Sequence, residues 1–160
     1  MYSTGGKMDK SRAATLLTRA ADQGHADAQF ILGHMYFHGD GVAAKKLQAA
    51  ELYAQSSEQG HVISQYNLGH MYYRGDGVPV DKARALSLFT LAADQGHLPA
   101  MNCLGYMLFR GDGVEEDKDR AVQLLEKVTE SRWMGSGMLK IELRNKFSYA
   151  MTIPYRLFGE

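Results

Sequence analysis

The sequence predicts an all-α fold, a solenoid of antiparallel helix pairs that repeats every 36 residues. Three motifs return at that spacing, with no residue inserted or lost between copies. They are Gln-Gly-His at 23–25, 59–61 and 95–97, Leu-Gly at 32–33, 68–69 and 104–105, and Gly-Asp-Gly-Val at 39–42, 75–78 and 111–114. A fixed period of this length marks a repeat architecture, in which each unit buries its apolar face against its neighbours. Recognition along an extended surface is therefore favoured over catalysis in a pocket.

The first helix of each unit, called helix A, is predicted from the middle copy. Between Ile63 and Tyr73 the apolar residues fall on one broad face of a helix. One slot of this helix holds glycine in all three copies, at Gly33, Gly69 and Gly105. Because glycine inside a helix costs about 1 kcal/mol relative to alanine, we expect a neighbouring helix to approach closely at this slot. The segment 75–77 then ends helix A with a glycine in the left-handed conformation.

The second helix of each unit, called helix B, is expected to start near Asp81, whose side chain can cap free N–H groups. The equivalent positions are Asp9, Asp117 and Lys45, so the copy with lysine lacks this cap. Small and large apolar side chains at helical spacing then interlock the two helices. They occupy three slots: Ala13, Ala49, Ala85 and Ala121; Leu16, Leu52, Leu88 and Leu124; and Leu17, Tyr53, Phe89 and Leu125. Gln-Gly-His closes helix B at a second left-handed glycine.

The period divides the chain into a solenoid over residues 9–133 and a C-terminal remainder. The repeats begin in mid-unit, so 9–24 is predicted to be an orphan helix B that covers the first complete unit, or the cut end of a longer array. Complete units are expected at 26–61, 62–97 and 98–133. The register fails at 131–133, where Ser-Arg-Trp stands in place of Gln-Gly-His. Residues 134–160 are predicted to form a C-terminal cap or tail.

Further positions repeat together with the motifs, and in the first complete unit they read Ala28, Leu32-Gly33, Tyr36 and Gly39-Asp40-Gly41-Val42. In these residues the chain resembles the Sel-1-like repeat, a relative of the tetratricopeptide repeat. Ser56-Ser57 departs from the family's double alanine, and Leu108 replaces its tyrosine. The resemblance implies a right-handed α-helical superhelix, with the first helices on its concave surface. It also implies a role as an adaptor or scaffold for other proteins.

The charge of the chain is balanced, since 18 Lys and Arg residues face 18 Asp and Glu residues. We therefore expect no nucleic-acid partner. No apolar run approaches the length of a membrane-spanning helix, so no membrane insertion is expected. Cys103 is the only cysteine, which rules out an internal disulfide. We expect a cytoplasmic protein; the alternative is a periplasmic or secreted protein whose signal peptide has been removed.

The histidines invite a metal hypothesis, but we expect neither a metal nor any other cofactor. A capping role accounts for the histidine of the repeated turn, at His25, His61 and His97. His34 and His38 lie four residues apart on one helix face, and His70 shares the slot of His34. Equivalent residues on stacked helices lie about 10 Å apart, so three ligands would not converge on one ion.

Other groups suited to catalysis are scarce, and we expect a protein that is not an enzyme. Cys103 has apolar flanks and no histidine close in sequence, so it is predicted to be a partly buried, unreactive thiol. No nucleophile elbow and no Cys-x-x-Cys motif is present. A hydrolase-type or metal-binding enzyme on a repeat scaffold is kept as the alternative.

One face of helix A is not used by the packing pattern, and we call it the A-helix face. Its residues are Phe30, His34, His38, Tyr66, His70, Arg74, Asn102, Tyr106 and Arg110. Aromatic and guanidinium groups are favoured at protein interfaces. We therefore predict that a non-catalytic scaffold or adaptor binds a protein or peptide partner on this face, with an inhibitor or immunity-type binding protein as the alternative. For Phe30 and Tyr66, packing between repeats is an equal alternative.

Overall fold

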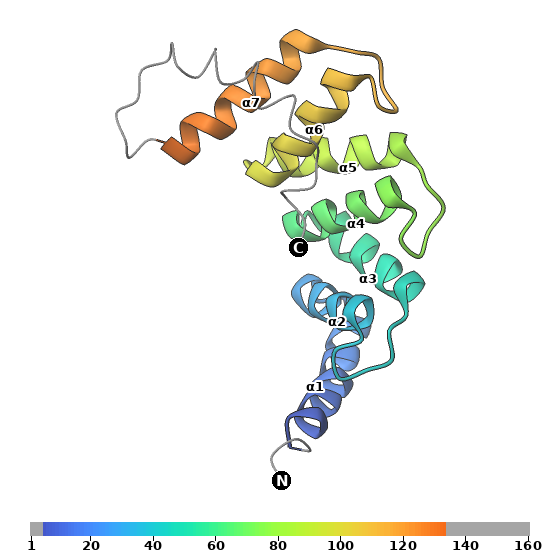
Figure 1. Cartoon of the computed structure of the whole chain (residues 1–160). Helices are drawn as coiled ribbons and strands as arrows, with labels where there is room; N and C mark the ends of the chain where they lie inside the picture. Colours follow the sequence, from blue (N-terminus) through green and yellow to red (C-terminus); the bar gives the residue numbers. More distant parts are fainter. Residues whose placement is uncertain (1–4, 134–160) are drawn as a thin grey trace. The chain divides into compact units, whose positions relative to one another are not determined.

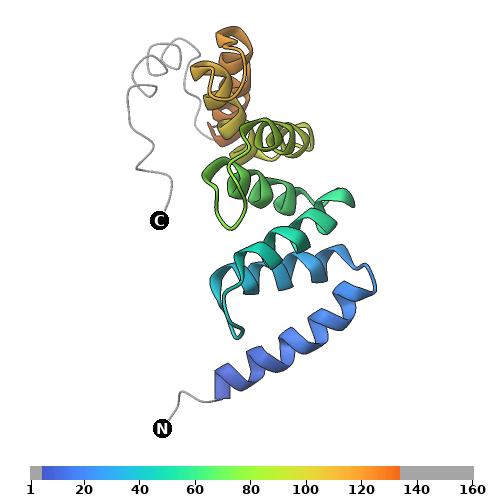
Figure 2. The same ribbon diagram turned by 90° about the vertical axis from the view of Figure 1, so that its right-hand side faces the viewer.

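The computed structural model describes residues 5–133, which form seven helices joined by turns and contain no strand. The helices are α1 (Gly5–Asp22), α2 (Ala26–His38), α3 (Lys46–Glu58), α4 (Val62–Arg74), α5 (Lys82–Asp94), α6 (Leu98–Arg110) and α7 (Lys118–Trp133). Figures 1 and 2 show them following one another in chain order, with successive helices running antiparallel. The described part therefore confirms the predicted all-α solenoid of helix pairs.

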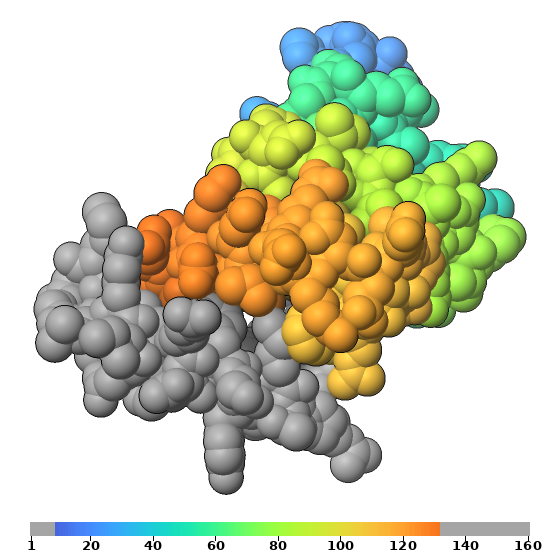
Figure 3. Space-filling view, turned by 90° about the horizontal axis from the view of Figure 1, so that it is seen from above, coloured from blue at the N-terminus to red at the C-terminus, as the bar shows by residue number. Residues whose placement is uncertain are grey.

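The chain divides into two compact units, residues 1–125 and 126–160, and the contacts discussed below lie within the first. The predicted cap or tail at 134–160 lies outside the described residues. Within the first unit, α2, α4 and α6 are A helices, while α1, α3, α5 and the beginning of α7 are B helices. Each helix from α1 to α5 contacts the helix that follows it in the chain, and Figure 3 shows the colours running from blue toward orange in that order.

Each A helix ends at a glycine with a positive φ, which is 71° at Gly39, 76° at Gly75 and 63° at Gly111. The N–H of this glycine donates to the carbonyl of the methionine four residues earlier. These ends confirm the predicted left-handed stops.

The B helices begin as predicted where aspartate is present. Asp81 Oδ1 accepts a hydrogen bond from the Arg84 N–H at 3.0 Å, Asp117 makes the equivalent bond, and Lys45 makes none. The first helix differs, because α1 begins at Gly5 and Asp9 lies inside it. The expectation that Asp9 marks a helix start was therefore wrong.

The turn histidines cap the A helices in two of three copies. His61 Nδ1 accepts a hydrogen bond from the Ser64 N–H at 3.1 Å, and His97 Nδ1 accepts one from the Ala100 N–H at 3.3 Å. The side chain of His25 makes no such bond. The predicted capping role is thus confirmed for the second and third A helices.

The glycine slot of helix A lies against the large side chain of helix B in the same unit. A Cβ atom built on Gly69 would lie 2.8 Å from Phe89 Cε1, closer than real Cβ contacts. The equivalent atom on Gly33 would lie 3.1 Å from Tyr53 Cδ1. Phe89 is only 1% exposed, and burial of such a side chain contributes about 1.5–3 kcal/mol. The close approach predicted from the glycine slot is confirmed.

The remaining core slots follow the predicted pattern in the complete units. The alanine slot is fully buried at Ala49, Ala85 and Ala121, and the methionines at 35, 71 and 107 are buried as well. Leu16 is a correction, since it was expected to be packed but is 64% exposed. Its equivalent Leu52 packs on the cluster that includes Leu32, on the A helix of its own unit. No A helix precedes α1 among the described residues.

Successive units are tied together by ion pairs between residues 30 apart. Lys46 Nζ lies 2.7 Å from Asp76 Oδ1, with the equivalent pairs Lys10–Asp40 and Lys82–Asp112 on either side. At the same contact a Cβ atom on Gly77 would overlap the Cβ and backbone of Lys46. The Gly-Asp-Gly turn of one unit is therefore seated on the start of helix B in the unit before it. Since these pairs are partly exposed, the seating of the turn contributes more to stability than the charges do.

Replacing Gly69 by valine should lower the free energy of unfolding by several kcal/mol, because the new side chain collides with the buried ring of Phe89. We expect a fall in melting temperature of more than about 3 °C, measured by circular dichroism. In a double-mutant cycle, Phe89→Leu should relieve part of the cost of Gly69→Ala, as Leu125 faces Gly105 in the third unit. If the losses in unfolding free energy of Gly69→Ala and Phe89→Leu simply add, contact with the Phe89 ring does not cause the destabilisation at Gly69.

Gly77→Ala should destabilise the protein more than Gly60→Ala. Both glycines have a positive φ, 76° and 85°, so each substitution carries the left-handed cost of about 1–2 kcal/mol. A Cβ atom on Gly60 meets nothing within 4 Å, whereas one on Gly77 meets Lys46. Urea unfolding of the two variants measures their free energies of unfolding. An equal loss of unfolding free energy in both would contradict the proposed seating of the turn on Lys46.

Candidate functional site

The nine residues of the A-helix face lie at equivalent positions of α2, α4 and α6. Five of them are exposed: His34, His38, Arg74, Asn102 and Arg110. The other four are half-buried: Phe30, Tyr66, His70 and Tyr106. Three of the nine, His38, Arg74 and Arg110, are the last residues of their helices, just before the capping glycines. A cation at a helix C-terminus complements the helix dipole, so Arg74 and Arg110 also have a structural role available.

The aromatic members of this face take part in packing at the turns. The ring of Phe30 stacks on His61, with centroids 4.7 Å apart, and Tyr66 lies 4.8 Å from His97 in the same way. Arg110 lies over the ring of Tyr106, with its guanidinium carbon 5.2 Å from the centroid. The structure thus gives Phe30 and Tyr66 a packing role, and a binding role for them stays a prediction.

A small cavity of about 220 Å³ opens among α2, α3 and α4, beside the A-helix face. Its apolar lining includes Phe37 and Met71. Its polar lining consists of His34, His38, Asn67, His70, Arg74 and Asp76. The rings of His34 and His38 lie close, with centroids 4.3 Å apart. The fold therefore brings His34 and His38 of α2 together with Arg74 of α4, three of the residues predicted from the sequence, around one cavity.

His70 is held neutral by its surroundings. Burial, reinforced by the charge of Arg74, lowers its pKa to about 4. Its Nδ1 atom is buried and has no hydrogen-bond partner within residues 5–133. Burial also lowers the pKa of His34, with His38 as a second cause and Asp40 opposing both. At neutral pH these imidazoles are therefore uncharged groups.

Sequence reasoning missed a contact between Cys103 and His70. Cys103 Sγ lies 3.6 Å from His70 Nε2, although the two residues are 33 positions apart in the chain. The signal was present, because 103 lies one helical turn before 106, the equivalent of 70. Since His70 stays neutral, it offers no positive charge to stabilise a thiolate, and the contact does not activate the cysteine.

A serine, a histidine and an aspartate also come together at the start of α4. Ser64 Oγ lies 2.9 Å from His61 Nδ1, and His61 Nε2 lies 3.6 Å from Asp27 Oδ1. This order resembles a catalytic triad, but Ser64 is fully buried and its hydroxyl donates to Ser56 at 2.8 Å. A substrate has no access to that oxygen, so the group is part of the packing between α3 and α4.

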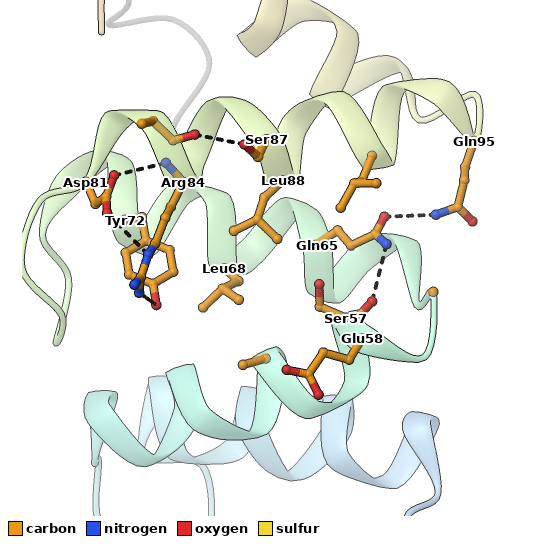
Figure 4. Close-up of a pocket in the computed structure, with 14 residues that line it drawn as sticks. Ser57, Glu58, Gln65, Leu68, Tyr72, Asp81, Arg84, Ser87, Leu88 and Gln95 are labelled. Carbon is orange, nitrogen blue, oxygen red and sulfur yellow. Dashed lines mark hydrogen bonds and ion pairs between the residues drawn. The ribbon is translucent and has the colours of Figure 1, made fainter.

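The larger cavity, of about 840 Å³, lies between the B helices α3 and α5 over α4 (Figure 4). Leu68 and Leu88 lie between a polar end at Arg84 and another at Glu58. Arg84 is engaged there, since its guanidinium donates to the hydroxyl of Tyr72 at 3.1 Å and pairs with Asp81. Sequence reasoning missed this cavity; the available signal was the small residues of the facing helices, Ala54, Ser57, Ala83 and Ser87.

Within residues 5–133, no three side chains of histidine, cysteine, aspartate or glutamate come together as ligands for a metal ion. None of the seven helices has the length and apolar character needed to cross a membrane.

Comparison with known proteins identifies the repeat. The family model described as the Sel1 repeat matches residues 1–25, 26–61, 62–97 and 98–129. No curated protein sequence matches the chain at a significant level.

Two solved structures are similar in both sequence and fold. The first is c5321, a protective antigen of uropathogenic Escherichia coli strains that displays an SLR fold, with 32% identity and a TM-score of 0.72 over 74% of this chain. The second is a Sel1 repeat protein from Oxalobacter formigenes, with 30% identity and a TM-score of 0.71 over 76% of this chain. The matches cover 25% and 48% of those proteins, so this chain spans less than half of each. The repeats, the helix-pair fold and the sequence identity agree, and the chain belongs to the Sel1 repeat family.

Proposed function

We propose that the chain is a non-catalytic scaffold that binds a segment of a partner protein across its A-helix face. One observation carries the proposal: the exposed arginines Arg74 and Arg110 recur in one slot, beside imidazole and aromatic groups, and no carboxylate pairs with either within residues 5–133. Desolvated arginine and aromatic side chains are the usual energetic centres of protein interfaces. The family supports an interaction role, because its repeats build extended surfaces rather than enclosed sites.

The alternative of an enzyme has less support. The best arrangement for acyl transfer places its serine hydroxyl out of solvent, and the cysteine faces a neutral histidine. Both arrangements are explained by helix packing. A binding protein that inhibits its partner would use the same face, so it is the same proposal with a different partner.

Replacing Arg74 and Arg110 together by alanine should abolish recovery of the partner while leaving the protein folded. The cost in stability is limited to the helix-end effect, about 0.3–1 kcal/mol for each arginine. The measurement is quantitative mass spectrometry of proteins enriched by wild type and variant, with melting followed by circular dichroism. Tyr106→Ala should lose the same partner.

Arg84→Ala is the matched control, because it removes an exposed arginine from the cavity between α3 and α5 instead. It should retain the partner. If the double variant recovers the partner as well as wild type does, the A-helix face is not the binding surface. Loss of the partner by Arg84→Ala alone would assign binding to the larger cavity.

A further inference from the structure

The turns that follow the A helices leave positive charge on the A-helix face. Asp76 lines the 220 Å³ cavity, but Lys46 of the preceding unit binds its carboxylate at 2.7 Å. Asp112 is held in the same way by Lys82 and by the hydroxyl of Tyr73. Hydrogen bonds from these two groups, with a smaller effect of Arg110, keep the pKa of Asp112 below its usual range. The aspartates are thus neutralised by the inter-unit pairs, and the neighbouring arginines are not.

We propose that the partner presents carboxylate side chains three residues apart on a segment in the polyproline II conformation, one entering the cavity beside Arg74 and the next meeting Arg110. This inference rests on the proposed function, since it names the partner chemistry of the same face. The proposed ligand groups are the side-chain carboxylates of aspartate or glutamate inside the partner segment, and not the carboxylate at a chain terminus.

The cavity has the lining that such a side chain needs. Arg74 offers a planar guanidinium that can bind both oxygens of a carboxylate, and His34 and His38 add ring nitrogens. The aliphatic part of the side chain would lie against Phe37 and Met71. A volume of about 220 Å³ admits one side chain rather than a helix. The cavity therefore selects the end of a single long acidic residue.

The spacing follows from the repeat. Arg74 and Arg110 occupy the same slot of α4 and α6, which touch where His70 meets Cys103, and helices in side-chain contact lie about 8–10 Å apart. A segment in the polyproline II conformation advances about 3.1 Å per residue and has three residues per turn, so its positions i and i+3 lie on one side, about 9 Å apart. Three residues of such a segment therefore span the distance between the two arginines, so the partner's acidic residues stand at positions i and i+3. A spacing of two would turn the second carboxylate away from the side that carries the first.

Three synthetic peptides test this without any protein variant. Each is a labelled, C-terminally amidated peptide of glycine and serine that contains Glu-x-x-Glu, Glu-x-Glu or Gln-x-x-Gln. Fluorescence anisotropy with the full chain should show the tightest binding for Glu-x-x-Glu. We expect binding about tenfold weaker for Glu-x-Glu, which keeps one of the two charge-assisted contacts, and weaker still for the glutamine peptide. Equal affinities of the three peptides would overturn the proposal, as would a failure of all three amidated peptides to bind.

A pair of protein variants locates the site. Arg74→Gln should weaken Glu-x-x-Glu binding about tenfold and remove the preference for three-residue spacing. Arg84→Gln, in the other cavity, should leave both unchanged. If both variants bind alike, the peptide binds elsewhere and the proposal is wrong.

The two proposals fail in different ways. If Arg74→Ala/Arg110→Ala and Tyr106→Ala lose the natural partner but no acidic peptide binds, the A-helix face is the interface and the carboxylate inference is wrong. If the acidic peptide binds at Arg74 but the natural partner is recovered by all variants, the carboxylate site stands and the proposed function fails.

Discussion

A large side chain packed over a glycine, within one helix pair, is the contact on which the other features of this array depend. Phe89 over Gly69 and Tyr53 over Gly33 bring helix B so close to helix A that the rings are almost fully buried. The end of helix A is set separately, by the capping glycine that turns the chain. Because a side chain at the glycine slot would push the helices apart, the close packing of each helix pair follows from the absence of one Cβ atom.

The seating of each turn on the unit before it then decides which charges the A-helix face keeps. The lysine at the start of helix B binds the aspartate of the next turn, as Lys46 binds Asp76. The arginine that ends the A helix is left without an acidic partner among residues 5–133. The same contact that joins the units therefore also leaves two arginines, Arg74 and Arg110, without a carboxylate partner on the described part of this face, although the net charge of the whole chain is zero.

Much of this arrangement could be predicted from the sequence, because equivalent residues recur at the same position of every 36-residue unit. The left-handed glycines, the Asp81 cap and the glycine slot are local features with a fixed position in each unit. What could not be predicted depends on how side chains of several helices combine. The cavity between α3 and α5 arises where small residues on two helices face each other, and the Cys103–His70 contact crosses a unit boundary. Leu16 shows a further limit, since a repeated slot does not reveal whether its packing partner is present.

The constant separation of 30 residues in the lysine–aspartate pairs has a consequence for how such arrays change in length. Every tie of this kind closes a loop of the same size, whether the array holds three units or many. Adding a whole unit introduces no new kind of contact and no longer loop, so the entropy of closure per unit is unchanged. Adding or removing a fraction of a unit would change the separation in the pair whose loop contains the change, while the other pairs keep theirs. Duplication and loss of complete units are therefore the changes in length that leave every lysine–aspartate pair intact.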